Sequence, residues 1–518
     1  MAIIDFFDRG WRANPGGTAY VMGETAYSFT EVRALSCQIA NQLLAEGFAP
    51  ETKGGVWSQN DPIAWTCTLG LWRAGLAWIP VGPAAPPEQN AAILDAFDCE
   101  VMFFQSGYAA AIEQVRPLLP RVRRWICIDQ DLPGAPSLAN WCGAADNSAP
   151  SLDLTMDGVA AVMPTGGTTG LPKGVMNTHR SIQTFVAHYL IAVTYGADDR
   201  PVNLAAAPMT HTAGLLSLPC TARGGTVVIL AKPDPATMFE AIERHRVTEL
   251  FLPPTVIYRL LETPGVETTD FSSLRYLMYG AAPMSLDKLK KAIEVLGPVM
   301  TGGYGQTEAP ASISYLRPDE HFVDGALASD QRLSSVGRPN PLIAVEILNA
   351  AGQVLGKGET GEICVRGDLV MKGYYKQPEK TAEAIVDGWL HTGDVGHIDV
   401  EGYLHITDRI KDMIISGGFN VYPNEVEQVI WSHPAVQDCA VIGVPHPDWG
   451  ETVKAVVELN PGQSVTADEL IALCKAQLGS VKAPKSIDFI DALPRSPVGK
   501  VLKKDLREAY WQGADRKI

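Results

Sequence analysis

The chain lacks three features that would otherwise define its class. Its nine cysteines include no Cys-x-x-Cys pair, which disfavours a zinc site or a disulfide scaffold and indicates a reducing compartment. No run of about 20 apolar residues occurs, so we expect no membrane-spanning segment. Asp and Glu outnumber Lys and Arg by 58 to 42. The resulting net charge of −16 disfavours a nucleic acid partner, because basic side chains are needed to neutralise phosphates.

The composition that remains fits a globular protein of at least two domains. Hydrophobic residues make up 46% of the 518 residues and charged residues 19%, and this length exceeds one ordinary core. Residues 1–8 carry two aspartates in an interrupted apolar run, which predicts no signal peptide. We therefore expect a cytoplasmic protein, and a homodimer is compatible with the sequence.

Strand-like and helix-like segments alternate along the chain. Residues 54–57 and 75–81 are predicted to be buried strands on either side of a helix over 61–74, and Thr30 is the expected N-cap of an earlier helix. Further along we expect strand and turn segments over 225–230, 248–255 and 274–283, and a helix over 235–245. Such alternation predicts parallel sheets covered by helices, so the fold class is α/β.

Residues 164–175 form the most informative stretch, Pro-Thr-Gly-Gly-Thr-Thr-Gly-Leu-Pro-Lys-Gly-Val. Glycines let the backbone approach an anion, successive amides can cradle it, and the threonine hydroxyls and Lys173 add donors and charge. The apolar run at 158–163 predicts a buried strand leading into the loop. We expect a phosphate-binding loop; the alternative is an ordinary solvated loop. It is not a Walker P-loop, because Lys173 is followed by glycine and not by Ser or Thr.

A second glycine-rich stretch, residues 301–308, reads Thr-Gly-Gly-Tyr-Gly-Gln-Thr-Glu. Tyr304 lies between glycines and can stack on a purine without steric interference. Thr307 can reach a phosphate, and Glu308 is a hard oxygen ligand suited to Mg²⁺ beside ATP phosphates. Taken alone, the stretch could be a chance loop.

Two further residues are candidates by their setting. Asp394, at the end of His-Thr-Gly-Asp over 391–394, can accept hydrogen bonds from ribose hydroxyls, although an Asp in a turn is usually only a turn former. Lys500 lies in a loop with Pro497 and Gly499, where a lysine is ordinarily just solvated.

In their order, these stretches resemble the signatures of the adenylate-forming enzymes: acyl-CoA synthetases, peptide-synthetase adenylation domains and luciferases. The resemblance covers nearly the whole chain. It implies a large N-terminal domain, residues 1–409, of sheets covered by helices with a small β subdomain. It also implies a small mobile α+β domain over residues 410–518.

The resemblance assigns a role to each signature. Lys500, Thr307 and Glu308 would be catalytic, with Glu308 also the ligand of Mg²⁺. Lys411 would be the hinge of the mobile domain, and Gly417 and Gly418 would border the arm of coenzyme A. The implied ATP site consists of Thr165, Gly166, Gly167, Thr168, Thr169, Gly170, Lys173, Gly280, Ala281, Ala282, Gly303, Tyr304, Gly305, Asp394 and Arg409. The implied acyl pocket consists of His211, Thr212, Ala213, Gly214, Gly302 and Gly303.

The expected reaction is that of an AMP-forming acid–thiol ligase, which makes acyl-CoA, AMP and diphosphate from an acid, ATP and coenzyme A through an acyl-adenylate. Peptide-synthetase domains carry an Asp where this chain has His211, so an amino acid substrate is disfavoured. The motifs expected to line the acyl pocket contain no arginine that could pair with a second carboxylate, so a dicarboxylic acid is disfavoured. Only 18 residues follow Lys500, too few for a carrier domain, so coenzyme A is the expected acceptor.

The acid itself is less well defined by the sequence. Small residues are expected to leave considerable space in the acyl pocket, which favours a linear or branched aliphatic acid; an aryl acid is the alternative. From other classes, a luciferase-type oxygenase and a nucleotide-binding pseudoenzyme stay open, although intact Lys500, Glu308 and Thr168 argue against the pseudoenzyme.

Overall fold

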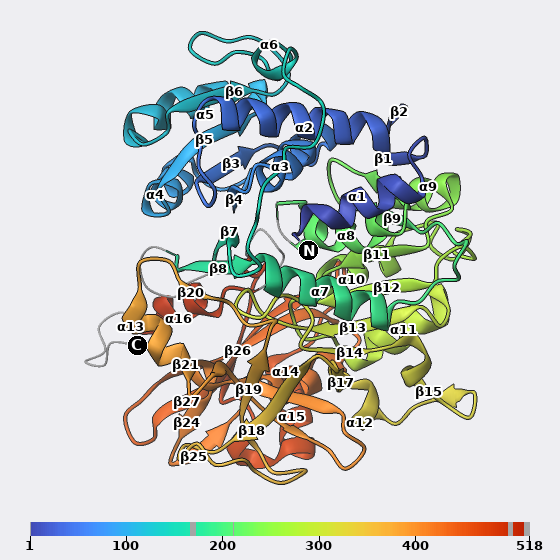
Figure 1. The fold of residues 1–518 in the computed structure, drawn as a ribbon. Coiled ribbons are helices and arrows are strands. Elements are labelled where there is room, and N and C mark those ends of the chain that lie inside the picture. The colour runs from blue at the N-terminus through green and yellow to red at the C-terminus, as the bar shows by residue number, and fades with distance from the viewer. Residues whose placement is uncertain (1, 166–171, 211, 496–500, 512–518) are drawn as a thin grey trace.

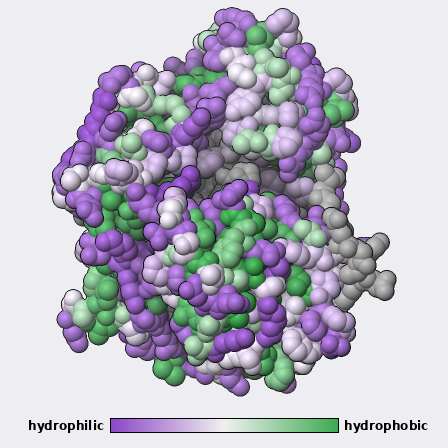
Figure 2. All heavy atoms as spheres, turned by 180° about the vertical axis from the view of Figure 1, so that it is seen from behind, coloured by the Kyte–Doolittle hydropathy of each residue, from purple (hydrophilic) through white to green (hydrophobic). Residues whose placement is uncertain are grey.

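The computed structural model describes residues 2–165, 172–210, 212–495 and 501–511. Figure 1 shows the N-terminal layers at the top and the C-terminal elements at the bottom. On the opposite face, the surface is hollowed between these upper and lower parts (Figure 2). Among the helices of the described residues, none is both long and apolar enough to cross a membrane.

The uppermost layer is a seven-stranded sheet in the order β20-β8-β7-β4-β3-β5-β6. Strands β7, β4, β3, β5 and β6 run parallel, and the β7–β8 and β8–β20 pairs are antiparallel. The strands are β3 Lys53–Trp57, β4 Ala77–Pro80, β5 Cys99–Phe104, β6 Arg124–Cys127, β7 Val159–Pro164, β8 Gly174–Thr178 and β20 Gly373–Tyr374. The intervening helices are α2 Phe29–Ala45, α3 Pro62–Arg73, α4 Pro87–Ala96, α5 Ala109–Val115 and α6 Leu138–Cys142.

A second sheet of nine strands has the order β17-β14-β13-β12-β11-β9-β10-β1-β2, and its central strands are parallel. They are β1 Thr18–Met22, β2 Thr25–Ser28, β9 Val202–Ala205, β10 Thr226–Ile229, β11 Glu249–Leu252, β12 Tyr276–Gly280, β13 Met300–Tyr304, β14 Ser314–Leu316 and β17 Arg338–Pro339. The accompanying helices are α1 Ile4–Ala13, α7 His179–Ala192, α8 Thr212–Ala222, α9 Pro235–His245, α10 Pro254–Glu262 and α11 Leu286–Leu296. The predicted α/β class is therefore confirmed.

The largest core cluster joins the two sheets through α3, α7 and α8. At its centre Trp65, Trp72 and Trp78 meet edge to face, with ring centroids 5.6 to 5.9 Å apart. The expected N-cap at Thr30 is wrong by two positions. Helix α2 begins at Phe29, because Ser28 and Glu31 form a reciprocal capping box that satisfies the first backbone amides.

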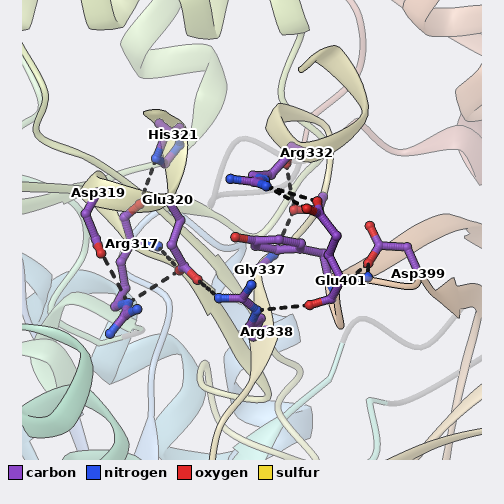
Figure 3. Close-up of polar contacts among 11 residues, drawn as sticks. Arg317, Asp319, Glu320, His321, Arg332, Gly337, Arg338, Asp399 and Glu401 are labelled. Atoms are coloured by element: carbon purple, nitrogen blue, oxygen red, sulfur yellow. Dashed lines mark hydrogen bonds and ion pairs between the residues drawn. The ribbon is translucent and has the colours of Figure 1, made fainter. Parts of the chain in front are cut away.

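A small β subdomain follows, with strands β18 Ile343–Leu348, β19 Gly361–Gly367, β21 Ile385–Val386, β22 Trp389–Ile398 and β23 Leu404–Arg409. Short elements border it: β15 Phe322–Val323, β16 Ala326–Leu327, α12 Asp330–Leu333 and α13 Pro378–Ala384. Figure 3 shows polar contacts at its junction with the second sheet. Arg338 of β17 donates to the carbonyl of Glu401, in the turn between β22 and β23, at 3.4 Å and also pairs with Glu320 at 2.9 Å, while Arg332 of α12 pairs with the Glu401 carboxylate at 2.9 Å.

Gly337 makes this junction possible. Its φ is +83°, and a Cβ there would lie 2.0 Å from the carbonyl group of Tyr315. Any other residue would be strained and would push the strands apart. The backbone of Gly337 instead accepts a hydrogen bond from the Leu404 amide, which fastens β23 to the edge of the second sheet.

The C-terminal elements have their own core. Strands β24 Ile414–Ser416, β25 Phe419–Val421, β26 Val436–His446, β27 Gly450–Leu459 and β28 Ser486–Phe489 form one sheet, with helices α14 Pro423–Trp431, α15 Ala467–Lys482 and α16 Lys503–Trp511. Val426, Val441 and Leu470 belong to a separate cluster of buried residues. Strand β23 ends at Arg409 and the new sheet begins at Ile414. The predicted boundary between residues 409 and 410 stays a prediction.

Candidate active site

The carboxylate of Asp394 on β22 is the meeting point of three chain segments. It accepts hydrogen bonds from Tyr304 Oη at 2.7 Å and from Gln306 Nε2 at 2.7 Å, both on Oδ2. Arg409 Nε lies 3.1 Å from the other oxygen, Oδ1. The antiparallel pairing of β22 with β23 places Asp394 directly opposite Arg409. Three residues expected at one nucleotide are thus brought together, and Asp394 is only 4% exposed.

Tyr304 is fixed as a neutral phenol by this arrangement. Burial, reinforced by the charge of Asp394, raises the pKa of Tyr304 well above its ordinary value. Its hydroxyl can then only donate toward the carboxylate, which holds the ring in one orientation at the end of β13. Gln306 completes the junction by donating to the carbonyl of Thr392 at 2.9 Å as well. Sequence reasoning did not single out Gln306, although it lies inside the recognised 301–308 stretch.

Glu308 takes part in a second junction, with Tyr374 of β20. Tyr374 Oη donates to Glu308 Oε1 at 2.9 Å, and Lys173 Nζ lies 4.3 Å from the centroid of the Tyr374 ring. The charge of Glu308 adds to burial in raising the pKa of Tyr374. Tyr374 was missed by sequence reasoning. No local pattern marks it, because its position follows from the pairing of β20 with β8 across 199 residues, from Val175 to Tyr374.

Thr307 is tied to the same region by its backbone. Its carbonyl accepts a hydrogen bond from Asn177 Nδ2 at 3.1 Å, and the carbonyl of Glu308 accepts one from the Met371 amide at 2.8 Å. The 301–308 stretch is therefore fastened to β8, the strand that follows the predicted phosphate loop. The carboxylate of Glu308 is a ligand that suits Mg²⁺ beside phosphates, and the ammonium of Lys173 can pair with the phosphates themselves.

The predicted phosphate-binding loop and the loop that carries Lys500 are each closed by a backbone hydrogen bond at their ends. The Thr165 amide donates to the carbonyl of Lys173 at 3.0 Å, and the Leu502 amide donates to the carbonyl of Pro494 at 2.8 Å. Several predicted site residues lie outside the described residues: Gly166, Gly167, Thr168, Thr169, Gly170, His211 and Lys500. The side chain of Thr212 is likewise outside them.

The expectation that small residues leave space in an acyl pocket is wrong at two positions, Gly214 and Gly302. A Cβ on Gly214 would lie 2.1 Å from the carbonyl of Met209 and 2.6 Å from the ring of Trp65. On Gly302 it would lie 2.9 Å from the hydroxyl of Tyr279. These glycines are small because backbone and aromatic rings already fill the space around them.

The turn after β12 shows the same close packing. A Cβ on Gly280 would lie 2.5 Å from the carbonyl of Gly303, its partner on β13, and one on Gly305 would lie 2.6 Å from the backbone of Ala311. Ala281 is exposed and has a φ of +67°, a conformation that a residue with a Cβ rarely adopts. Ala282 follows it, half-buried, and Ala213 is buried on α8.

Gly303 differs from the other glycines. A Cβ there would lie 3.3 Å from Cε1 of Tyr315, the residue opposite it on β14. The neighbour is therefore the edge of an aromatic ring and not a fixed backbone atom. Gly303 immediately precedes Tyr304 in β13, so the backbone that the Tyr315 ring borders continues into the residue that contacts Asp394.

The segment expected to act as a hinge is held by the last helix. Arg507 on α16 pairs with Asp412 at 2.8 Å, and its guanidinium also donates to the carbonyl of Lys411. Lys503 on the same helix pairs with the buried Glu427 at 2.7 Å. The Lys411 side chain itself is exposed. These contacts lie within the predicted C-terminal domain, residues 410–518, and fasten its last helix to its first residues.

Gly417 and Gly418 form the turn between β24 and β25. Both have positive φ, +57° and +84°, and the Gly417 amide donates to the carbonyl of Trp449 at 3.1 Å. Two large side chains beside the turn are exposed, Phe419 by 62% and Trp449 by 45%. The turn therefore lies on the surface of the C-terminal sheet, with aromatic groups next to it.

Comparison with known proteins places these junctions in a family. The family model described as AMP-binding enzyme matches residues 7–375, and the model described as AMP-binding enzyme C-terminal domain matches residues 425–500. A feruloyl-CoA synthase of Amycolatopsis is 36% identical over 502 residues, 96% of this chain and 97% of that protein. A medium/long-chain-fatty-acid–CoA ligase of Mycobacterium tuberculosis is 41% identical over 373 residues, 71% of this chain and 64% of that protein.

Solved structures agree with this placement. The amide bond synthetase McbA of Marinactinospora thermotolerans has a TM-score of 0.89 and 31% identity, covering 98% of this chain and 100% of its own. The ATP-bound MatB of Rhodopseudomonas palustris has a TM-score of 0.88 and 29% identity, covering 98% of this chain and 99% of its own.

Proposed function

The chain belongs to the AMP-binding enzyme family, and from this premise we propose that it is an AMP-forming acid–thiol ligase. It joins a carboxylic acid to coenzyme A with ATP, through an acyl-adenylate. The observation that carries the proposal is the junction at Asp394, where Tyr304, Gln306 and Arg409 converge on one buried carboxylate. The second junction brings Glu308, which follows β13, together with Tyr374 of β20 and with Lys173, which precedes β8.

The nucleoside part of ATP is held at the first junction. Each carboxylate oxygen can accept about two hydrogen bonds. Oδ2 already accepts two, from Tyr304 and Gln306, so Asp394 can receive one ribose hydroxyl on Oδ1, beside Arg409. Arg409 contributes a guanidinium on the same side. Tyr304 presents its ring to the purine, and the backbone of Gly280, Ala281 and Ala282 lies along the edge of the base.

The triphosphate is held by the loop that begins at Thr165 and by Thr307 and Lys173. Glu308 would hold Mg²⁺, which when bound neutralises phosphate charge. The substrate carboxylate then attacks the α-phosphorus, and the bond to the leaving pyrophosphate breaks. Lys500 stabilises the charge that develops on the phosphate oxygens. Because little covalent chemistry is asked of the protein, catalysis is positioning plus electrostatic stabilisation.

In the second half-reaction the sulfur of coenzyme A attacks the acyl carbon, and AMP leaves. We propose that the C-terminal domain turns about Lys411 between the two half-reactions, which exchanges Lys500 for the turn at Gly417 and Gly418. The exposed Phe419 and Trp449 flank that turn and can pack against the arm of coenzyme A. Cytoplasmic location and a homodimer stay predictions.

The acid is either of the two kinds considered from the sequence. The similarity to a fatty-acid–CoA ligase supports an aliphatic acid, and the similarity to a feruloyl-CoA synthase supports an aryl acid. The acyl side adjoins Gly303 and Ala213, on the side of the second sheet that α7 and α8 cover.

AMP release tests the proposal, measured over a panel of aliphatic and aryl acids with and without coenzyme A. Acid-dependent AMP release that rises with coenzyme A, together with Mg²⁺-dependent exchange of labelled pyrophosphate into ATP, is the expected result. A folded protein that gives neither with any acid would contradict the assignment. Release supported by an amine in place of coenzyme A would point instead to amide synthesis.

A further inference from the structure

We propose that the acid carries a hydroxyl group at the end of its acyl part, and that His188 and Tyr315 recognise this hydroxyl. The inference rests on the proposed function and narrows its substrate to a hydroxylated acid. It is carried by two buried polar atoms, His188 Nε2 and Tyr315 Oη, that have no hydrogen-bond partner of normal geometry among the described residues.

His188 lies on α7, fully buried, and its tautomer is fixed by its neighbours. Nδ1 lies 3.0 Å from the carbonyl oxygen of Ser312 and 3.1 Å from its hydroxyl. A carbonyl oxygen can only accept, so Nδ1 carries the proton. Burial lowers the pKa of His188 to about 4, so the ring is neutral near pH 7. Nε2 is therefore a bare acceptor that needs a donor.

Tyr315 offers the opposite group. Its side chain is 3% exposed, and burial raises its pKa, so the phenol stays protonated and can donate. The hydroxyl of Ser312 lies near enough to affect this pKa but makes no normal hydrogen bond with the phenol. A ligand hydroxyl can donate to His188 Nε2 and accept from Tyr315 Oη. An alkyl end can do neither.

Both side chains lie where the acyl part of the substrate is proposed to bind. The ring of Tyr315 borders Gly303, next to Tyr304 of the nucleotide junction. His188 contacts the same segment through the carbonyl of Ser312. That carbonyl also accepts a hydrogen bond from Asn340 Nδ2 at 2.7 Å. Around them, α7 and the second sheet share one apolar cluster, which includes Phe185.

Other buried polar atoms of the described residues also lack a hydrogen-bond partner of normal geometry, among them Tyr20 Oη, Trp65 Nε1 and Trp78 Nε1 of the same cluster. His188 Nε2 and Tyr315 Oη differ from these because they are an acceptor and a donor on two residues that both adjoin Ser312. Buried donors and acceptors normally pair with protein, ordered water or a ligand. Two complementary atoms left open beside the proposed substrate site, one acceptor and one donor, match the hydrogen-bonding capacity of a single hydroxyl. We therefore assign them to substrate recognition; a bound water serving the same atoms is the outcome that the experiment must exclude.

The experiment compares matched acids that differ by one hydroxyl: 4-hydroxycinnamate with cinnamate, and 12-hydroxydodecanoate with dodecanoate. The readout is kcat/KM from AMP release. A site built to bind a hydroxyl rejects the analogue without it strongly, so we expect a preference of at least about 100-fold in one of the pairs. The pair that shows it separates phenolic from aliphatic hydroxylated acids.

Two variants test whether His188 and Tyr315 cause the preference for the hydroxylated acid. His188→Phe and Tyr315→Phe should each reduce it by about tenfold or more, with the loss confined to the hydroxylated acid, because the partner of its hydroxyl is gone. His188→Gln keeps an acceptor and should recover part of the preference. Thr184→Val is the matched control. Its hydroxyl bonds only within α7, to the carbonyl of Arg180, so its preference should equal that of the wild type.

Each outcome has a distinct meaning. AMP release with equal kcat/KM for both members of each pair would overturn this inference and leave the proposed function intact. An unchanged preference in both His188→Phe and Tyr315→Phe, with thermal unfolding showing that they fold, would also overturn it, because other residues would then recognise the hydroxyl. No AMP release with any acid would overturn the proposed function, and this inference with it.

Discussion

The nucleotide side and the acyl side of the proposed site differ in how their polar groups are satisfied. Around Asp394, each polar group already has a protein partner before any ligand is considered, with Tyr304, Gln306 and Arg409 all in place. Around Ser312, two buried atoms of His188 and Tyr315 have none. The first region is preorganised for a ligand shared by a whole family, whereas the second is open in a way that only a particular acid would complete.

This contrast suggests where substitutions should act. Changes on the nucleotide side should impair the reaction with every acid, because ATP is common to all of them. Changes on the acyl side should alter which acid is preferred and leave ATP use unaffected. The four predictions below test this division, beginning with the largest effect.

The largest effect is expected from Lys500→Ala. Loss of one charge at the developing oxyanion should slow adenylation by about 10²–10³-fold, measured as pyrophosphate exchange with any accepted acid. Conversion of preformed acyl-AMP and coenzyme A to thioester should stay near normal, because Lys500 is proposed to act in the first half-reaction only.

Lys504→Ala is the control for Lys500, because this exposed lysine on α16 pairs only with Glu508 on the surface. If both half-reactions fell equally in Lys500→Ala, the alternation of domains about Lys411 would have to be abandoned.

The second prediction concerns the centre of the nucleotide side. Asp394→Asn replaces one carboxylate oxygen by an NH₂ group. Because Gln306 and Arg409 donate to opposite oxygens, the N–H groups of one of them would then face another donor. Because a hydrogen bond to a charged group contributes about 1.5–3 kcal/mol, kcat/KM for ATP should fall by roughly 10–100-fold, equally for every acid. Asp399→Asn, on the same hairpin but paired with His405, should leave ATP use unaffected. A loss of kcat/KM for ATP that differed between acids would contradict the proposed separation of the nucleotide side from the acyl side.

The nucleotide side was also the more predictable of the two from sequence. Its residues lie in glycine-rich stretches whose chemistry can be read locally, as at Tyr304 and Asp394. Helix α9 was predicted to the residue, since Asp234 caps it and Pro235 occupies its first turn. Tyr374 could not be predicted, because the pairing of distant strands places it.

The acyl side was predicted least well. Glycine in a sequence can mean open space or close packing, and at Gly214 and Gly302 it meant close packing. His188 belongs to no sequence motif. Its protonated nitrogen is determined by the carbonyl of Ser312, 124 residues away in the chain. Only the three-dimensional structure shows which nitrogen is satisfied and which is not.

The third prediction is smaller and concerns Tyr374. Tyr374→Phe removes the hydrogen bond to Glu308 and should weaken apparent Mg²⁺ affinity by about tenfold, the lower range for groups that orient a metal ligand. The measurement is the Mg²⁺ dependence of pyrophosphate exchange. Tyr375→Phe is the matched control, because the neighbouring hydroxyl bonds to Asp98 instead. An identical Mg²⁺ dependence in both variants would mean that Glu308 is not the metal ligand.

The last prediction has the smallest effect and tests the acyl side by protein stability, first without substrate and then with the preferred acid. The pKa of His188 is lowered from 6.5 to about 4 by burial, so the folded state stays neutral where the unfolded chain takes up a proton. Stability from this group is therefore full above pH 6.5 and is lost as pH falls toward 4, by at most about 1.4 kcal/mol per pH unit.

The urea midpoint should thus fall less between pH 7 and pH 5 in His188→Phe than in the wild type or in Thr184→Val. His179, whose pKa is lowered to about 4 in the same way but whose Nδ1 accepts from the Ile3 amide, contributes equally to all three proteins and cancels. Because the hydroxyl is proposed to donate to Nε2, which stays unprotonated in the folded state at both pH 7 and pH 5, the preferred acid should stabilise the wild type more than it stabilises His188→Phe at both pH values. If the acid stabilised both proteins equally at both pH values, its hydroxyl would not be reaching His188.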